Sequence, residues 1–513
     1  MDPMNHSARI LGSAALLVLA RPALAATLQV GPGKTYAKPC AAFAAAAQND
    51  TITIDAAGNY DGDVCAIAPA GLTIRGVNGR AHIDAAGQNA QGKGIWVVQG
   101  AGITIENIEF SGATVVDHNG AGIRAEGNGL TIRNCYFHDN QEGILGGSGE
   151  VLIELSEFGH NGNCDDPSGC AHNMYLSNSV TKFTLRYSYT HSAFEGHLVK
   201  SRAQANYIIS NRITGEDGTD SYEIDLPNAG TAYIIGNLIE QSSTTGNPTI
   251  VTYGEEGPSN AGKDLYVVNN TIVNDRSSGT FVNVDGRVTT PAVVKNNIFL
   301  GTGTAVSQAG ATVANNFTGD PMLVNRAGYD YHLLAGSPCI GAGADPGLAG
   351  SFSLTPATQY IHPSNFETRP VVGVIDIGAY EFDGGQDGGA PGTGGAAGTG
   401  GATATGGASS GSGGNSSSGG SSNGGSGNTS RGGASGTAGR GGTGGATSGA
   451  GGSGMPGVPT DGGAAEPAAA DKGGCGCRAV GAAPRSPLGA LAAVAVVMMI
   501  RKRRRAPPCG PRS

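Results

Sequence analysis

Short runs in which β-branched or aromatic residues alternate with polar residues recur along most of the chain. The unit is clearest in two near-copies, YIISNRIT at Tyr207 and YIIGNLIE at Tyr233. Alternation with a period of two is typical of a strand, and a repeat of some 25 residues is typical of a strand solenoid. We therefore predict stacked coils of short parallel strands. The ten aligned copies begin at Leu72, Ile103, Leu130, Val151, Phe183, Tyr207, Tyr233, Tyr266, Val293 and Thr312.

One helix is predicted in this part of the chain. The segment Lys38–Ala47, KPCAAFAAAA, is short and rich in alanine, which favours helix. It comes just before the first strand-like run, TITID at Thr51. A helix there would cover the open end of the stack, as terminal segments of solenoids do. We expect it to be a cap.

Asparagine occupies the fifth position in seven of the ten copies. Asparagine tolerates tight turns, and its side chain bonds to neighbouring backbone groups. Stacked coils would place these side chains in a ladder, so we interpret them as structural rather than as a sugar-binding row. They are Asn107, Asn134, Asn211, Asn237, Asn270, Asn297 and Asn316.

The motifs LTIRNCYF, YIISNRIT, YVVNNTIV and VVKNNIF, with their repeated asparagine, carry a family resemblance. The chain resembles the right-handed parallel β-helices of the pectate-lyase-like superfamily from about Val30 to Phe382. The ending YHLLAGSPCIGAGAD followed by DIGAYEF resembles the closing segment of many exported bacterial β-helices. The resemblance implies an all-β, right-handed parallel β-helix. The activities of that superfamily are diverse, so the fold does not select one.

The two ends of the chain differ from its middle. His6 and Arg9 precede an apolar run that ends in a small-residue cleavage pattern, Ala23-Leu24-Ala25, as in a secretory signal peptide. Gly, Ser, Ala and Thr dominate after Phe382, which predicts a flexible stalk without a core. The predicted divisions are 1–26 signal peptide, 27–382 β-helix domain, 383–473 disordered linker, 474–505 anchor segment and 506–513 tail.

The anchor segment has three parts: a Gly-Cys motif, an apolar run at 488–500 and the arginine cluster RKRRR. It resembles the myxobacterial C-terminal sorting signal (MYXO-CTERM type). The resemblance implies trimming by a membrane-embedded sorting protease and a cell-surface anchor through Cys475 or Cys477. The alternative is a plain transmembrane anchor, for which 13 apolar residues are few. Either way, we expect an exported protein at the cell surface.

Export places cysteines where disulfides persist. Proximity in the repeat predicts that Cys40 pairs with Cys65 and that Cys164 pairs with Cys170. The other two cysteines of the body are then expected to be buried as small hydrophobic residues. They are Cys135 and Cys339.

The predicted body carries 18 Lys and Arg against 34 Asp and Glu, a net charge of −16. Such a body repels nucleic acid and other polyanions unless a metal ion or a local basic island intervenes. We expect no nucleic-acid partner, and we expect a monomer. The segment HLVKSR, with Lys200 and Arg202, is such a basic island.

Candidate chemistry gathers on the short strand that precedes each repeat unit. Alternation predicts that Val199, Ile224, Ile250 and Thr252 point inward, while charged and tyrosine side chains point outward from neighbouring coils. This outward group fits uronate elimination, which needs a carboxylate neutralised, a base and an acid. Carboxylates could hold a Ca²⁺ ion for the first task. The outward group comprises Tyr175, Lys200, Arg202, Glu223, Asp225, Tyr253 and Glu255.

A second, partial resemblance concerns EGHLVKSRAQANYIISNRI. It is similar to the region of the catalytic lysine in the alginate lyase and chondroitinase B family, where a carboxylate lies five residues before a Lys-Ser pair. Glu195 and Lys200-Ser201 match that spacing. The other metal-binding carboxylate of that family falls on Ala193, and its downstream arginine has no clear match. The resemblance implies Lys200 as the base and Glu195 near a metal ion.

Two functions are therefore open. The first is a surface-tethered polysaccharide lyase acting on an acidic polymer. Its roles are Lys200 as base; Arg202 or Tyr253 as acid; Glu195, Glu223 and Asp225 around Ca²⁺; and Tyr175, His197 and Glu255 against the substrate. The second is a non-catalytic surface β-helix that binds carbohydrate or a neighbouring cell. A structural interpretation of the same charged residues is also open: Lys200 would pair with Glu223, and Arg202 with Asp225, as ordinary cross-strand ion pairs.

Overall fold

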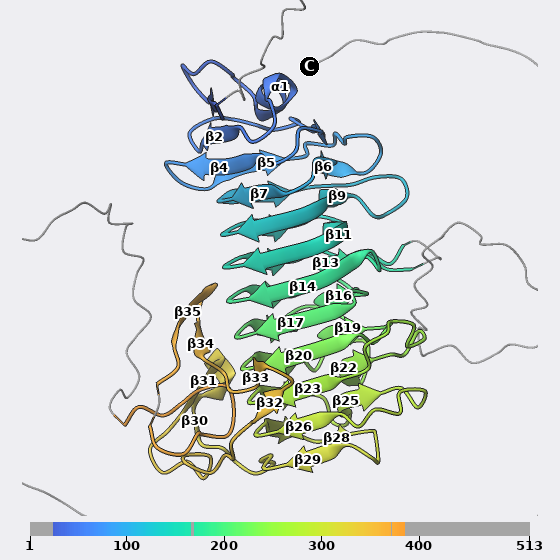
Figure 1. Cartoon of the computed structure of the whole chain (residues 1–513), viewed down its shortest axis with the longest axis vertical. Coiled ribbons are helices and arrows are strands. Elements are labelled where there is room, and N and C mark those ends of the chain that lie inside the picture. Colours follow the sequence, from blue (N-terminus) through green and yellow to red (C-terminus); the bar gives the residue numbers. More distant parts are fainter. Residues whose placement is uncertain (1–23, 166–168, 371, 385–513) are drawn as a thin grey trace, which may run out of the picture. The chain divides into compact units, whose positions relative to one another are not determined.

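The computed structural model describes residues 24–165, 169–370 and 372–384, and it forms a stack of parallel coils (Figure 1). Most coils run through three strands in turn, so the strands pile up into three ladders. We call these ladders face 1, face 2 and face 3, in the order in which the chain visits them. Residues 1–23 of the predicted signal peptide, most of the linker, and the anchor segment with Cys475 and Cys477 lie outside the described residues. No helix within the described part is long and apolar enough to cross a membrane.

Face 1 contains the repeat units that the sequence revealed. Nine of the ten predicted starting positions lie in its strands and Leu72 directly precedes β4, and the register pairs Leu130 with Ile103 and Val151. One shift occurs, because Phe183 pairs with Asn206 rather than with Tyr207. The strands of face 1 are β1 (Thr27–Val30), β2 (Thr51–Asp55), β4 (Thr73–Val77), β7 (Ile103–Glu106), β9 (Ala121–Arg133), β11 (Glu142–Glu154), β14 (Val180–Arg186), β17 (Ala205–Ile209), β20 (Thr231–Ile235), β23 (Leu265–Val268), β26 (Val293–Lys295) and β29 (Thr312–Ala314).

Face 2 follows face 1 after a tight turn, in which a residue with left-handed backbone reverses the chain. Asn107, Asn134, Asn269 and Asn296 occupy this turn with φ between 51° and 58°. Asparagine suits it because its short polar side chain tolerates that conformation. The strands of face 2 are β5 (Ala81–Asp84), β8 (Ile108–Ser111), β10 (Tyr136–His138), β12 (Glu157–Gly159), β15 (Tyr189–His191), β18 (Arg212–Thr214), β21 (Leu238–Gln241), β24 (Thr271–Asn274) and β27 (Ile298–Gly301).

Face 3 returns the chain to the next coil and shares one continuous sheet with face 1. The sheet is continuous because β9 and β11 are 13 residues long and contribute to both faces. Its other strands are β3 (Cys65–Ile67), β6 (Gly94–Val98), β13 (Met174–Leu176), β16 (Val199–Ser201), β19 (Ile224–Leu226), β22 (Thr249–Tyr253), β25 (Thr280–Val284) and β28 (Thr304–Val306).

Alternate side chains from all three faces fill the interior with aliphatic and aromatic residues. Phe137 stacks between Phe110 and Phe158, with ring centroids 5.0 and 4.7 Å apart. The predicted cap is present: α1 spans Pro39–Ala45, shorter than expected at both ends. Its Phe43 packs edge-on against Trp96 at 5.0 Å and closes the N-terminal end of the core.

The predicted asparagine ladder exists, but its membership differs from the prediction. Five of the seven form it, each side-chain amide donating to the next side-chain oxygen at 2.9–3.0 Å. Asn107 and Asn134 lie one position earlier, in the turn, and are outside it. Towards the N-terminus the ladder continues through Ser188 and Ser156, whose hydroxyls accept from the next backbone N–H. The five are Asn211, Asn237, Asn270, Asn297 and Asn316.

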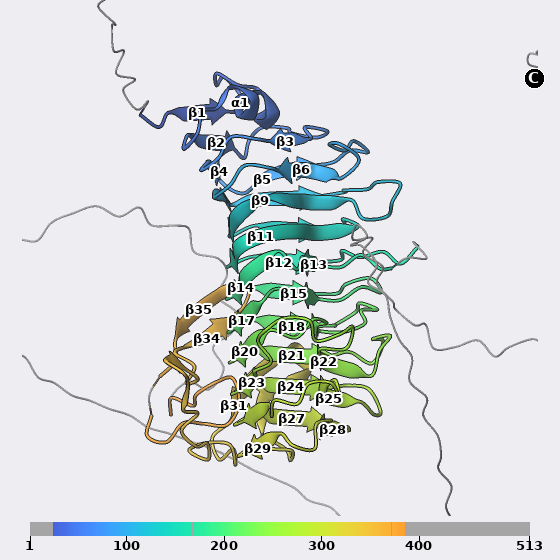
Figure 2. The ribbon, with the colours of Figure 1, turned by 45° about the vertical axis from the view of Figure 1, so that its right-hand side comes forward.

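After β29 the chain leaves the stack and folds back along its side as antiparallel pairs (Figures 1 and 2). Phe366 stacks on Tyr187 at 3.8 Å, and Ser210 donates to the backbone of Thr358 at 2.9 Å. This returning segment includes both stretches that resemble a closing segment, and they lie against the turns of the stack, where Asn296 donates to Ala344 and Asn269 to Asp376. The returning segment covers outer surface rather than adding a coil. Its elements are β30 (Leu323–Asn325), η1 (Arg326–Gly328), β31 (Asp330–Leu333), β32 (Leu348–Ala349), β33 (Phe352–Ser353), β34 (Thr358–Ile361) and β35 (Asn365–Thr368).

The cysteine predictions are confirmed. Cys40 is bonded to Cys65, which ties α1 to the first strand of face 3. Cys164 is bonded to Cys170 in the loop that precedes β13. The two remaining cysteines of the body are free and buried: Cys135 and Cys339.

Candidate functional site

The predicted charged cluster lies on the outer side of face 3, where β13, β16, β19 and β22 stack. The register aligns Tyr175, Lys200 and Asp225, and then Thr252, in one column across four coils. Their neighbours in the strands, such as Val199 and Ile224, point into the core. Because equivalent side chains of parallel coils repeat about every 4.8 Å, the four polar groups form a continuous row.

Lys200 lies at the centre of the row and is buried, although it points away from the core. Its Nζ donates to Glu256 Oε1 at 3.0 Å and lies 3.4 Å from Asp225 Oδ2. It also lies 5.4 Å from the centre of the Tyr175 ring. The expected pairing of Lys200 with Glu223 is therefore wrong, because the register places Asp225 opposite Lys200.

Arg202 continues the cluster two residues further on. Its Nε donates to the Tyr175 hydroxyl at 2.6 Å, and its other nitrogens bond to Asn228 and to Glu256 Oε2. The expected pairing of Arg202 with Asp225 is also wrong. The two oxygens of Glu256 are thus divided between Lys200 and Arg202. Burial acts to raise the pKa of Glu256, but these two cations outweigh it and leave that pKa below its ordinary value.

Two buried histidines lie just before strands β13 and β16, next to Asp225. His172 and His197 are buried and stack with ring centroids 4.5 Å apart, and His197 Nε2 lies 3.5 Å from Asp225 Oδ2. Burial, together with the neighbouring cations, holds the pKa of both imidazoles well below the ordinary value. Burial raises the pKa of Asp225 to about 6, although Lys200 opposes this shift. The predicted contact residue His197 therefore supports Asp225 and is shielded from solvent.

Tyr253, predicted as an acid on the outer surface, points the other way. The register pairs Ile224 with Val251 and Leu226 with Tyr253, one position off the expected alternation. Tyr253 is packed in the core, and its hydroxyl donates to the Gly230 carbonyl at 2.6 Å. It cannot reach a substrate on face 3, so that assignment is wrong.

The structure does not bring the three predicted calcium ligands together. Glu195 is exposed in a loop, with φ at +60°. Glu223 is fully buried, and its Oε2 accepts from Gln241 at 3.4 Å, at the corner between faces 2 and 3. Among the described residues, no group with three ligand atoms within 4.8 Å of one another includes either of them or Asp225.

Glu255, the remaining predicted contact residue, is exposed beside the cluster. It accepts from Tyr222 at 3.1 Å and from Thr252 at 2.7 Å. Its neighbour Glu256, which sequence reasoning missed, is the residue that contacts both cations. A surface hollow does exist elsewhere, near the C-terminal end of the stack, but its lining includes none of the predicted site residues. That lining includes Leu300, Asp320, Met322 and Arg326.

Buried carboxyl groups next to Glu223 predict an unusual dependence of stability on pH. Burial raises the pKa of Glu240 to about 8 from an ordinary 4.5. The folded state thus favours its protonated form, and this stabilisation is complete below about pH 4.5 and is lost as the pH rises through about 8. We expect Glu240→Gln to flatten the decline in unfolding free energy between pH 5 and 8 by about 2–4 kcal/mol.

Urea unfolding of the two proteins at four pH values across this range measures the effect. Glu150→Gln is the matched control, since the Glu150 side chain is 75% exposed. It should keep the wild-type slope. An unchanged slope in Glu240→Gln would show that Glu240 ionises normally in the folded state.

A family model supports the fold. The family described as "Right handed beta helix region" matches residues 70–182. Pectate lyase Pel9A is 18% identical, with a TM-score of 0.49, and the match covers 70% of this chain and 97% of that chain. ORF18 of Geobacillus virus E2 is 15% identical, with a TM-score of 0.35, over 54% of this chain and 56% of that chain. No curated protein matches the sequence. The described body is a right-handed parallel β-helix.

Proposed function

We propose that this protein is an exported, surface-anchored β-helix that binds an acidic polysaccharide on face 3 and cleaves it by β-elimination. The observation that carries the proposal is the Glu256 carboxylate held between Lys200 and Arg202. Two cations that each contact one oxygen of a carboxylate would hold the carboxylate of a uronate sugar equally well. Glu256 comes from the loop after β22, so it occupies a place that a substrate carboxylate would take after this loop moves.

The surroundings of Lys200 change its predicted role. Its Nζ lies 3.4 Å from Asp225 and 3.0 Å from Glu256, so both carboxylates already engage the amine. An amine held in this way is a partner for carboxylates rather than a base. We therefore assign Lys200 and Arg202 to neutralising the uronate carboxylate, which makes the proton on the adjacent C5 carbon more acidic.

Tyr175 is the best-placed group to move that proton. Arg202 donates to its hydroxyl at 2.6 Å, and both cations lie within 5.6 Å of its ring centre. As a base, the tyrosine would act through its phenolate. The phenolate would take the C5 proton, the C4–oxygen bond would break as the C4–C5 double bond forms, and the phenol would return the proton to the departing oxygen. Atoms and charge balance without a metal ion or another reactant.

The assay incubates the purified full chain with alginate, pectate and chondroitin, with and without Ca²⁺, and follows the ultraviolet band of an unsaturated uronate. Arg202→Met should abolish the band. Glu256→Gln should lower KM several-fold, because a neutral amide competes less with the substrate carboxylate. Glu150→Gln, an exposed carboxylate on face 1, is the control and should match the wild type.

A second function is favoured by one observation: the charged groups of the cluster are already paired with one another. Such a surface would bind a uronate polymer without cleaving it if the substrate carboxylate displaces Glu256 but Tyr175 does not reach the C5 proton. Retention on an immobilised uronate polymer, without the ultraviolet band, would support this binding function and contradict elimination. Neither retention nor a band on any of the polymers would contradict both.

The proposed location rests on different features. The apolar N-terminal run and the Cys-containing, apolar and arginine-rich parts of the anchor segment support export and surface attachment. The two disulfides also support export, because disulfides persist outside the reducing cytosol. Surface attachment would place the face 3 cluster where extracellular polysaccharide is available.

A further inference from the structure

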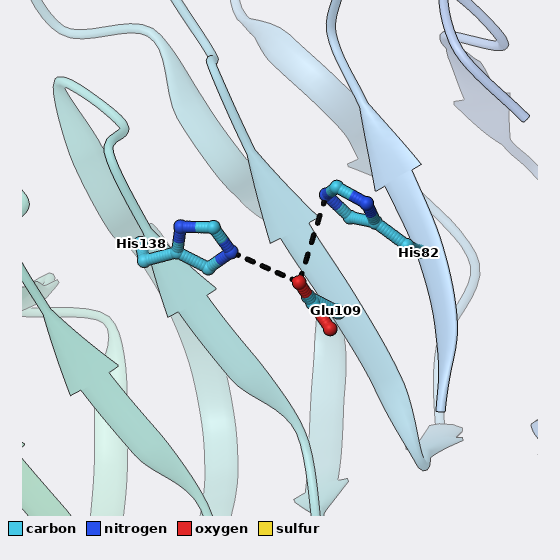
Figure 3. A group of neighbouring side chains, drawn as sticks. All are labelled: His82, Glu109 and His138. Atoms are coloured by element: carbon cyan, nitrogen blue, oxygen red, sulfur yellow. Dashed lines mark hydrogen bonds and ion pairs between the residues drawn. The ribbon is translucent and has the colours of Figure 1, made fainter. Parts of the chain in front are cut away.

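Two histidines and a glutamate converge on face 2, and Figure 3 shows their side chains. His82 in β5, Glu109 in β8 and His138 in β10 come from three successive coils. Glu109 Oε1 lies 3.1 Å from His138 Nε2 and 3.8 Å from His82 Nε2. All three ligand atoms lie within 4.8 Å of one another, the one such group within residues 24–165, 169–370 and 372–384.

These separations are close to those of a tetrahedral metal site. Zinc bonds to histidine nitrogen and carboxylate oxygen at about 2.0–2.2 Å, which places two ligand atoms about 3.4 Å apart at a tetrahedral angle. The two measured separations lie on either side of that value. The two histidine nitrogens lie within 4.8 Å of each other, so rotation of the imidazole rings is needed to bring all three atoms to bonding distance.

Groups behind the ligands already orient them. Asp139 Oδ2 lies 2.6 Å from His138 Nδ1, so it accepts that N–H and directs Nε2 towards Glu109. The Tyr136 ring stacks on His138 at 4.3 Å and fixes its plane. A carboxylate behind a metal-binding histidine is the usual outer partner of such a ligand. This arrangement is a second feature that points to a metal site.

His82 is held in place by a different contact. Ser111 donates its hydroxyl proton to Asp84 at 2.6 Å and therefore accepts from His82 Nε2 at 2.7 Å. A metal ion bound to His82 Nε2 would replace the hydrogen bond between that nitrogen and Ser111. The side chains of His82 and Glu109 are 43% and 27% exposed, so an ion can enter from solvent. Asp84, Glu109 and Asp139 together outweigh the nearby Arg80 and leave the site negative.

We propose that His82, Glu109 and His138 bind one divalent transition-metal ion, with zinc the best match to this donor set. The ion fastens three coils together near the capped end of the stack. Its fourth position faces solvent and takes a water molecule, as in zinc sites with two histidines and a glutamate. The site lies on a different face from the proposed carbohydrate-binding cluster and does not depend on that function.

Equilibrium Zn²⁺ binding to the purified full chain, in competition with a chromophoric chelator, tests the proposal. Wild type should bind one more equivalent of Zn²⁺ than His82→Ala, His138→Ala or Glu109→Gln. Zinc bound by cysteines elsewhere in the chain is the same in all four proteins and cancels in this comparison. Each substitution should weaken this site by more than about 100-fold, since even outer partners contribute 10- to 100-fold. Asp139→Asn should weaken it about 10-fold. Co²⁺ should give the visible absorption of tetrahedral coordination in wild type only.

The matched control is His332→Ala. His332 Nδ1 also lies 2.6 Å from a carboxylate, that of Asp330, and is exposed. Its loss should leave zinc binding and the Co²⁺ spectrum unchanged. Glu109→Gln keeps the size and shape of the side chain, so it separates loss of a ligand from loss of folding. Equal zinc binding by wild type, Glu109→Gln and His138→Ala would overturn the proposal, as would an equal loss in His332→Ala.

Discussion

Replacing Lys200 with methionine is expected to lower the free energy of unfolding at pH 7 by about 3–5 kcal/mol. The side chains of Lys200 and Asp225 are only 1% and 4% exposed, and Glu256 Oε1 lies 3.0 Å from the ammonium group. Without the lysine, two carboxylates face each other, with water largely excluded from Asp225. Removing one member of a buried ion pair is costly because the remaining charge loses both its partner and its solvent.

Urea unfolding, followed by circular dichroism, measures this loss. Lys182→Met is the control, because Lys182 Nζ lies 3.6 Å from Glu150 in an exposed pair, which is worth about 1 kcal/mol or less. Adding Asp225→Asn to Lys200→Met should restore part of the stability, since the uncompensated charge is then removed. A loss below 1 kcal/mol in Lys200→Met would mean that water reaches Asp225 and that the cluster is open.

The strand pattern predicts which side chains share a face, but not whether these charged groups form a buried ion network or an exposed row of ion pairs. Alternation correctly put Tyr175, Lys200 and Asp225 on one side of face 3. It failed for Tyr253, because β22 is displaced by one residue, and such a slip exchanges the inner and outer sides of a strand. Glu256 was missed because it lies in a loop, where no periodicity indicates which strand a side chain will contact.

The fold could be predicted from the sequence more fully than the site. Stacked coils repeat the same local pattern many times, so an error in one copy leaves the overall prediction intact. The metal-site residues show the opposite case. His82 aligns with Glu109 across the sheet, but His138 lies two residues beyond the equivalent position. The three side chains converge because of the directions in which they point, which the strand repeat does not predict.

Replacing Asn237 with alanine is expected to lower the free energy of unfolding by about 4 kcal/mol, at roughly 1 kcal/mol for each of four hydrogen bonds. Asn237 lies in the middle of the ladder and is fully buried. Its amide donates to the Ile208 carbonyl at 2.8 Å and to Asn270 Oδ1 at 3.0 Å. Its own oxygen accepts from the backbone and the side chain of Asn211 at 2.9 and 3.0 Å.

The loss of stability should depend on whether the asparagine lies in the ladder or in the turn before it, and not on its being asparagine. Asn134 matches the same sequence position, yet it lies at the surface with φ at 51°. Asn134→Gly keeps that backbone accessible and should cost less than about 1 kcal/mol. Asn237→Asp, nearly identical in shape, should be at least as damaging as alanine, because a carboxylate cannot donate to Ile208 or Asn270. Thermal and urea unfolding of the three variants test this. Equal losses at Asn134 and Asn237 would mean that the ladder adds nothing beyond the turn itself.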